Sequence, residues 1–302
     1  CSVSPIYERG CEANGCRRLQ ECREGSVMSR GDDQALLRLT DIRKVFSRGT
    51  VDEITALNGI NLDVYEQDFV TVIGSNGAGK STLLNIIAGI YPPERGGRVR
   101  VLDKDITNIP EYKHAAYVGR VYQNPSEGTA AKLTIEENMA MALLRGRSRG
   151  LRLATNKRRR EQFCSALALL GLGLEDRLNT YVSTLSGGQR QSLALVMATI
   201  SKPAILLLDE HIATLDPKTA ETVLELTDMI VRREKMTTIM VTHNMDIALR
   251  YGNRLIMMHN GKILVNMGEE EKKKLTIADL VASFERAAGE EFKDDSIMLS
   301  QR

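Results

Sequence analysis

A single stretch decides the fold of this chain: Gly74-Ser75-Asn76-Gly77-Ala78-Gly79-Lys80-Ser81-Thr82. It follows a short apolar, β-rich run at 69–73 and opens a segment at 81–88 with the composition of a helix. Glycines let the backbone wrap closely around phosphate groups, and the N–H groups at a helix N-terminus attract negative charge. The pattern G-x-x-x-x-G-K-[ST] in this strand–loop–helix context therefore predicts a phosphate-binding P-loop, with Lys80 on the β- and γ-phosphates and Ser81 on Mg²⁺.

A second stretch carries two acids at the end of an apolar run. Residues 204–210 read AILLLDE and end in Asp209 and Glu210. Such a run predicts a buried strand that delivers carboxylates at its C-terminal end, where α/β sheets bind ligands. Together with the P-loop, it predicts that Asp209 holds the Mg²⁺ shell and that Glu210 polarises an attacking water.

The rest of the chain alternates between strand-like and helix-like segments from residue 35 onward. Apolar runs predict strands at 36–46, 57–64, 69–73, 98–102, 117–122, 204–208, 237–242, 254–258 and 262–265. Helical spacing predicts helices at 81–88, 134–144, 157–170, 187–201, 217–233, 245–251 and 276–288. Asn260 and Gly261 give a strong hairpin signal between the last two strands. The order predicts an α/β fold, with a P-loop core, an antiparallel β subdomain and an α-helical insert.

A third motif, LSGGQ at 185–189, precedes the two acids. By itself it predicts a loop with Ser186 as the N-cap of the following helix. A glycine-rich helix N-terminus also suits a γ-phosphate presented from outside the chain. Both interpretations are compatible with the sequence.

The three motifs together resemble the ABC ATPase family, over roughly residues 35–268. The resemblance implies two copies packed head to tail, with each ATP held between the P-loop of one copy and the LSGGQ signature of the other. In that arrangement the signature acts in trans through Ser186, Gly187, Gly188 and Gln189.

The same resemblance gives expected roles to four further residues. Phe46 stacks on adenine, and Gln123 senses Mg²⁺ and the γ-phosphate and relays to a membrane partner. His243 ends the strand after the two acids and contacts the γ-phosphate, and Asp216 belongs to the D-loop. The expected catalytic residues are then Glu210, His243 and Lys80, the expected Mg²⁺ ligands are Ser81, Gln123 and Asp209, and the expected cofactors are ATP and Mg²⁺.

One position departs from the family pattern. The family reads D-E-P-T after the apolar strand, whereas this chain has His211 and Ile212 after Glu210. The loss of proline frees the backbone at this turn, and His211 adds a titratable group beside Glu210. His211 either tunes hydrolysis or is simply tolerated, and we favour the second interpretation.

Composition places limits on the class of protein. The 302 residues carry a formal net charge of +2, with 42% hydrophobic and 26% charged residues, which is typical of a soluble globular chain. The charge is too small to argue for nucleic-acid binding. No apolar run approaches the roughly 18 residues that span a bilayer, so we expect a separate polypeptide to cross the membrane.

The first residues differ from the rest in composition. Four of the five cysteines lie at Cys1, Cys11, Cys16 and Cys22, a spacing that fits no zinc pattern, and Cys164 stands alone. We expect residues 1–34 to be a disordered or non-native extension, residues 35–268 to be the ATPase domain with a helical subdomain at about 125–200, and residues 269–302 to form a charged C-terminal helix and tail.

A run of basic residues interrupts the predicted helical insert. Eight cations lie there without an acid, at Arg145, Arg147, Arg149, Arg152 and 157–160. The first interpretation is a solvated loop. The second is contact with anionic lipid or with a membrane partner, where each cation gains on the order of 1 kcal/mol. Nucleic-acid binding is the third, but no aromatic residues interleave the run.

The expected function is ATP hydrolysis that powers transport, most consistent with a bacterial importer and with a weak preference for an amino-acid-type substrate. The expected partners are a second copy, transmembrane permease subunits and an extracytoplasmic substrate-binding protein, at the cytoplasmic face of the inner membrane, without nucleic acid. The alternative is a non-transport ABC ATPase acting on DNA or ribosomes. The segment between Lys80 and Leu185 is too short for the coiled-coil or zinc-bearing insertions of DNA-associated relatives, and the chain has one nucleotide unit where translation factors have two.

Overall fold

The computed structural model describes residues 34–146 and 156–288. The expected extension at 1–33, part of the basic run and the tail after residue 288 lie outside the described residues. Within the described part of the chain, no helix is long and apolar enough to cross a membrane.

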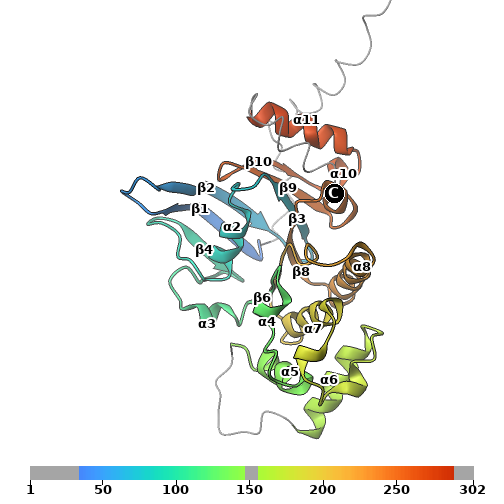
Figure 1. The fold of residues 1–302 in the computed structure, drawn as a ribbon. Coiled ribbons are helices and arrows are strands. Elements are labelled where there is room, and N and C mark those ends of the chain that lie inside the picture. The colour runs from blue at the N-terminus through green and yellow to red at the C-terminus, as the bar shows by residue number, and fades with distance from the viewer. Residues whose placement is uncertain (1–33, 147–155, 289–302) are drawn as a thin grey trace, which may run out of the picture. The chain divides into compact units, whose positions relative to one another are not determined.

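The described residues form two sheets (Figure 1). The first has four strands in the order β2-β1-β4-β5, all antiparallel. Its strands are β1 (Leu37–Phe46), β2 (Ile54–Val64), β4 (Arg98–Val101) and β5 (Lys104–Asp105). Buried and exposed residues alternate along β4 and the start of β1, so one face of this sheet packs on a core and the other meets solvent.

The second sheet has six strands among the described residues, in the order β10-β9-β3-β8-β7-β6. It contains β3 (Phe69–Gly74), β6 (Val118–Val121), β7 (Ile205–Asp209), β8 (Thr237–Val241), β9 (Arg254–His259) and β10 (Lys262–Met267). All neighbours are parallel except β10, which returns antiparallel to β9. Strands β3, β7 and β8 are buried along their whole length, which explains why they contain no charged residue except Asp209 at the end of β7.

Helices pack on this parallel sheet. They are α2 (Lys80–Ile87), α7 (Gly187–Thr199), α8 (Pro217–Glu234), α9 (Met245–Arg250), α10 (Glu269–Lys272) and α11 (Ile277–Ala288). Helix α2 directly continues the P-loop that leaves β3. Helix α11 buries Leu280 and Phe284 in a cluster with Met245 of α9 and Leu255 of β9, so its apolar face is covered.

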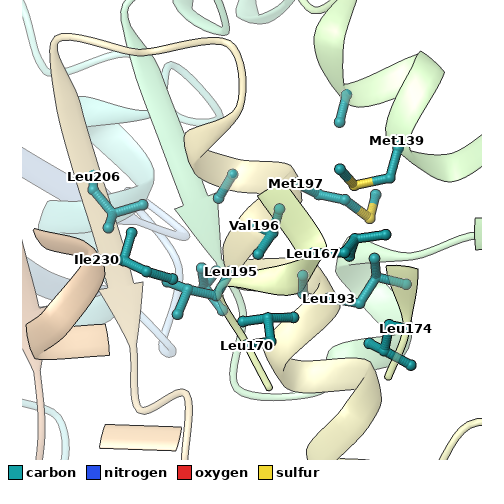
Figure 2. Close-up of a cluster of buried hydrophobic side chains, with 14 of the residues drawn as sticks. Met139, Leu167, Leu170, Leu174, Leu193, Leu195, Val196, Met197, Leu206 and Ile230 are labelled. Atoms are coloured by element: carbon teal, nitrogen blue, oxygen red, sulfur yellow. The ribbon is translucent and has the colours of Figure 1, made fainter. Parts of the chain in front are cut away.

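The helical insert has its own packing. It comprises α4 (Pro125–Gly128), α5 (Ile135–Leu143) and α6 (Lys157–Ala168), which meet α7. Figure 2 shows side chains from α5, α6 and α7 in one buried cluster that continues to Leu206 of β7 and Ile230 of α8. The long α7 therefore ties the insert to the parallel sheet. Helix α5 begins with a capping box, in which Thr134 and Glu137 satisfy each other's backbone N–H groups.

The α/β fold predicted from the sequence is confirmed. Each predicted strand and helix is present, and its ends lie within two residues of the predicted ends, except that β2 begins three residues earlier than predicted. The hairpin is also confirmed, because Asn260 and Gly261 both have positive φ, at 44° and 71°. Several short elements were not predicted from the sequence, among them β5, α3 (Glu111–His114), α4 and α10. Helices of four residues contain too few positions to show a helical period.

Candidate functional site

The predicted chemical residues converge at one edge of the parallel sheet. Gly74 ends β3, Asp209 ends β7, and His243 follows β8 by two residues. Because these strands are parallel, their C-terminal ends lie at the same edge, which is where open α/β sheets bind ligands.

The P-loop backbone requires glycine at two positions. Gly79 has a φ of 94°, and a Cβ there would lie 2.4 Å from the carbonyl oxygen of Ala56. Gly74 leaves no room either, because its Cβ would lie 2.4 Å from the carbonyl oxygen of Met258. Backbone atoms cannot move aside as flexible side chains can, so these glycines are needed for the close turn into α2.

Lys80 is held inside the loop. Its Nζ donates to the carbonyl oxygens of Gly74 at 2.7 Å and Ser75 at 3.0 Å, and the residue is buried. Burial lowers the pKa of Lys80, while the charges of Glu210 and Asp209 oppose that shift. The ammonium can exchange these neutral carbonyls for the charged oxygens of a phosphate, a stronger partner.

Two oxygen atoms that can coordinate a metal ion lie together beside the P-loop. The Ser81 hydroxyl donates to Oδ1 of Asp209 at 3.4 Å. The described residues contain no cluster of three or more His, Cys, Asp or Glu side chains that could hold a metal ion on its own. Mg²⁺ typically keeps several waters and uses one or two protein oxygens together with substrate phosphates, so Ser81 and Asp209 fit it.

A third group at this place was not predicted from the sequence. The other carboxylate oxygen of Asp209, Oδ2, accepts a hydrogen bond from Nη2 of Arg120 at 2.7 Å. Arg120 lies in β6, whose sequence VGRV is otherwise apolar or small. The charged residue inside this short apolar strand was the one feature of the sequence that could have indicated a buried ion pair.

Glu210 and His243 form a pair at the same edge. Nδ1 of His243 lies 3.4 Å from Oε2 of Glu210. The hydrogen bond from His243, with the charges of His243 and Lys80, lowers the pKa of Glu210 despite partial burial. Glu210 is therefore ionised near neutral pH and can accept a hydrogen bond from water. Its φ of 43° is unusual for a non-glycine residue, and residues held in such conformations cluster at functional sites.

His211 points into the protein interior. It is 1% exposed, its Nε2 lies 3.2 Å from the Thr227 hydroxyl of α8, and burial lowers its pKa to about 4. The ring carries no charge near neutral pH, which favours the interpretation that histidine is tolerated at this position.

The LSGGQ motif begins α7 as a cap. Ser186 Oγ accepts from the backbone N–H of Gln189 at 3.2 Å, and Gln189 Oε1 accepts from the N–H of Ser186 at 3.2 Å. The N-cap interpretation is thus confirmed. Ser186 and Gly187 are exposed, and no hydrogen bond among the described residues joins the motif to the P-loop of its own chain.

Two of the remaining candidates, Gln123 and Asp216, follow strands that end at this edge, whereas Phe46 belongs to the first sheet. Gln123 follows β6, is exposed, and accepts a bond from the Thr214 hydroxyl through its carbonyl oxygen at 3.5 Å. Asp216 caps α8 by accepting a hydrogen bond from the N–H of Thr219 at 3.1 Å, and hydrogen bonding from Thr219 lowers the pKa of Asp216. Phe46 ends β1 and meets another ring, that of Tyr91, edge-on at 5.3 Å.

Part of the basic run is described. Lys157, Arg158, Arg159 and Arg160 form the first turn of α6, where the helix dipole disfavours cations. Arg160 contacts Asn179 at 3.1 Å and Glu136 at 3.7 Å. The positions at 147–155 lie outside the described residues, so the three interpretations of this run stay open.

Comparisons with known proteins agree with this geometry. The family model for the ABC transporter matches residues 57–213. A tyrosine transport ATP-binding protein of Clostridioides difficile is 42% identical over 252 residues, covering 83% of this chain and all of that protein. A methionine import ATP-binding protein of Enterococcus faecalis is 33% identical over 233 residues, covering 76% of this chain and 64% of that protein.

Solved structures give the same result. A dimeric ATP-binding cassette in a post-hydrolysis state with ADP and Pi aligns with a TM-score of 0.66 and 29% identity, covering 77% of this chain and 98% of that one. The strand–loop–helix around Lys80, the paired acids and the LSGGQ cap all lie within the residues that the family model matches, and the chain belongs to the ABC transporter family of ATP-binding ATPases.

Proposed function

We propose that this chain powers a membrane importer as one half of a head-to-tail ATPase dimer bound to separate permease subunits. The observation that carries the proposal is the meeting of Lys80, Ser81, Asp209, Glu210 and His243 at one edge of the parallel sheet. These groups provide what phosphoryl transfer to water requires, namely charge on the phosphates, oxygen ligands for a metal ion and a carboxylate for the water.

In the proposed reaction the chain positions groups around ATP. Lys80 and the loop N–H groups bind the β- and γ-phosphates, and Phe46 stacks on the adenine. Ser81, Asp209 and Gln123 would hold Mg²⁺, which supplies neutralising charge on the phosphate oxygens when bound. Glu210 orients the attacking water, supported by its lowered pKa, and His243 contacts the γ-phosphate.

The dimer is proposed because the signature motif is exposed on its own chain. Ser186 and Gly187 lie at the start of α7, where backbone N–H groups favour an anion. In a two-fold dimer this helix end would meet the γ-phosphate bound by the partner copy, with Asp216 of the D-loop near the interface. The aligned cassette with ADP and Pi is itself dimeric, which supports this arrangement.

A cavity supports the proposed permease contact. Its volume is about 870 Å³, and it lies between the first sheet, α3 and the end of α5. Its lining includes the apolar and aromatic residues Ile106, Ile109, Tyr112, Tyr117 and Leu144, together with Lys104 and Lys113. We propose that a short segment of a permease subunit docks here, at the cytoplasmic face of the membrane.

The proposed substrate class is an amino acid, delivered by an extracytoplasmic binding protein. The stretch at 123–138 loosely resembles ATPases of amino-acid importers. The names of the tyrosine transport and methionine import relatives support the same class.

The test is to recover the assembly from the native cell with a tagged Glu210→Gln chain. This change slows hydrolysis and should hold the ATP-closed state. After extraction in mild detergent with Mg-ATP, mass spectrometry should find a polytopic membrane protein in near-equal amount. A tagged Lys80→Met chain treated identically is the control, and it should recover less of a second ATPase copy.

A different outcome would replace the transport proposal. Recovery of DNA, ribosomes or only soluble proteins would favour a non-transport ABC ATPase, while leaving the ATPase chemistry intact. Recovery of a membrane protein whose binding-protein companion carries sugars or metals would contradict only the amino-acid class.

A further inference from the structure

A buried arginine joins three elements beneath the nucleotide site. Nη2 of Arg120 donates to Oδ2 of Asp209 at 2.7 Å, and its Nη1 donates to Oδ1 of Asn85 at 2.5 Å. The side chains of Arg120 and Asp209 are only 10% and 12% exposed. Arg120 lies in β6, Asn85 in α2 and Asp209 in β7.

The location of Asn85 connects this contact to the P-loop. It follows Ser81 by four residues in α2, so both side chains lie on the same face of the helix. The guanidinium also lies 4.6 Å from the ring centre of Tyr122, the residue before Gln123. Arg120 therefore touches the P-loop helix, the acidic strand and the segment that leads to Gln123.

A buried ion pair such as Arg120–Asp209 stabilises a fold poorly for its desolvation cost. Removing each ion from water costs several kcal/mol, and well-packed apolar residues often do as well or better. Nε of Arg120 is also buried without a hydrogen-bond partner among the described groups. A role of Arg120 in orienting Asp209 explains the buried ion pair better than packing does.

The contact fixes which oxygen of Asp209 faces the P-loop. With Oδ2 held by Arg120, the free oxygen Oδ1 is directed to the Ser81 hydroxyl at 3.4 Å. The charge of Asp209 also acts on Lys80, whose pKa it raises. If Arg120 is removed, the Asp209 carboxylate is free to turn toward the Lys80 ammonium and to compete with phosphate for it.

We propose that Arg120 is a positioning residue for the metal site. It holds Asp209 so that Oδ1 and the Ser81 hydroxyl face the Mg²⁺ of bound nucleotide together, and it links this arrangement to the strand before Gln123. The inference rests on the proposed Mg²⁺ role of Ser81 and Asp209. Removal of a partner that orients a metal ligand typically lowers metal affinity by roughly 10- to 100-fold.

The chain offers a matched control for the loss of a buried ion pair. Arg254 donates to Asp68 at 3.1 Å and to Asn266 at 2.8 Å, with side-chain exposures of 15% for Arg254 and 5% for Asp68. Arg254 begins β9, so it lies at the opposite edge of the sheet from Asp209. Arg254→Met therefore removes a similar pair without touching the site.

The experiment measures how much Mg²⁺ strengthens ATP binding to the full chain. A fluorescent ATP analogue is titrated with excess Mg²⁺ and again with EDTA, and the ratio of the two Kd values is compared between variants. We expect Arg120→Met to reduce this ratio by about 10-fold and Arg254→Met to leave it within about two-fold, while thermal unfolding shows that both variants are folded. Arg120→Lys, which keeps the charge but loses the fork of two donors, should fall between wild type and Arg120→Met.

Asn85→Ala keeps the proposal testable if Arg120→Met does not fold. It removes only the second anchor of the guanidinium, so the ratio should fall by about three-fold. An unchanged ratio in folded Arg120→Met or Asn85→Ala, or an equal loss in Arg254→Met, overturns the positioning role alone. A wild-type chain whose ATP affinity does not depend on Mg²⁺ contradicts the proposed metal site itself, and the inference with it.

Discussion

Gly188 allows a packing effect to be separated from a catalytic one. A Cβ on Gly188 would lie 2.3 Å from Cγ2 of Thr219 in α8, whereas one on neighbouring Gly187 would lie 3.5 Å from the Leu215 side chain. Carbon atoms pack at about 3.5–4.0 Å, so in Gly188→Ala the Thr219 methyl group must move by roughly 1 Å or more. Thr219 is β-branched and its N–H is held by Asp216, so it yields little.

The expected magnitude follows from this overlap. Overpacking of this kind costs about 1–3 kcal/mol, and we expect about 2 kcal/mol for Gly188→Ala. In a domain of this size that lowers Tm by about 4–8 °C. Gly187→Ala should not lower Tm, because alanine favours a helix over glycine by up to about 1 kcal/mol.

The assay combines thermal unfolding without nucleotide and steady-state ATP hydrolysis. Thr219→Ser removes Cγ2, so Gly188→Ala/Thr219→Ser should recover the Tm of the Thr219→Ser single variant. Its ATPase activity should stay low, as should that of Gly187→Ala, because in the proposed dimer an added methyl group at this helix end crowds the approach of the γ-phosphate bound by the partner copy. A normal Tm for Gly188→Ala, or no recovery with Thr219→Ser, refutes the packing argument; full activity in the rescued variant refutes the role in trans.

Three further predictions concern stability and the P-loop. His211 has a pKa of about 4 when folded, below its ordinary value of 6.5, so the unfolded chain binds the proton more readily and stability is lost as pH falls from about 6.5 to about 4. The loss of free energy of unfolding approaches roughly 3 kcal/mol. Urea unfolding of the nucleotide-free chain with EDTA should show that the free energy of unfolding depends less on pH in His211→Leu than in wild type. An unchanged pH dependence in His211→Leu would contradict this role of His211. Thr134→Ala breaks the capping box of α5 and should lower the free energy of unfolding by about 1 kcal/mol, whereas Thr50→Ala, which removes only an exposed hydrogen bond from the hydroxyl to the Ser47 carbonyl oxygen, serves as the control and should change it less. Gly79→Ala places a methyl group 2.4 Å from the Ala56 carbonyl at a φ of 94°, so ATP binding by calorimetry should be abolished; near-normal affinity would show that the loop tolerates a side chain there.

Much of the fold follows from local sequence patterns. The uninterrupted apolar run before Asp209 predicted the buried strand β7, and such a run is typical of a strand that is covered on both faces. Asn260 and Gly261 predicted their hairpin because the turn needs positive φ at both positions. In these cases the residues that define the element are adjacent in the chain.

The features that sequence did not predict depend on tertiary neighbours. Arg120 meets Asp209 and Asn85 only because β6 pairs with β7 and because α2 packs close to β7. The position after Glu210 reads as a departure from the family, but the burial of His211 against Thr227 becomes visible only in the structure. The order of residues along one chain does not determine such contacts.

In the proposed dimer, hydrolysis uses the P-loop of one copy and the signature of the other. We would mix a chain carrying Lys80→Met with a chain carrying Ser186→Arg, each inactive alone. In a two-fold dimer the mixed pair contains one site with both changes and one site with neither, so ATPase activity should return on mixing, to roughly a quarter of wild type. A chain with both changes mixed with wild type forms no intact site in the mixed dimer and should add nothing beyond the wild-type dimers present. Failure of the two inactive chains to restore activity, when chemical crosslinking shows that mixed dimers form, would contradict the shared site.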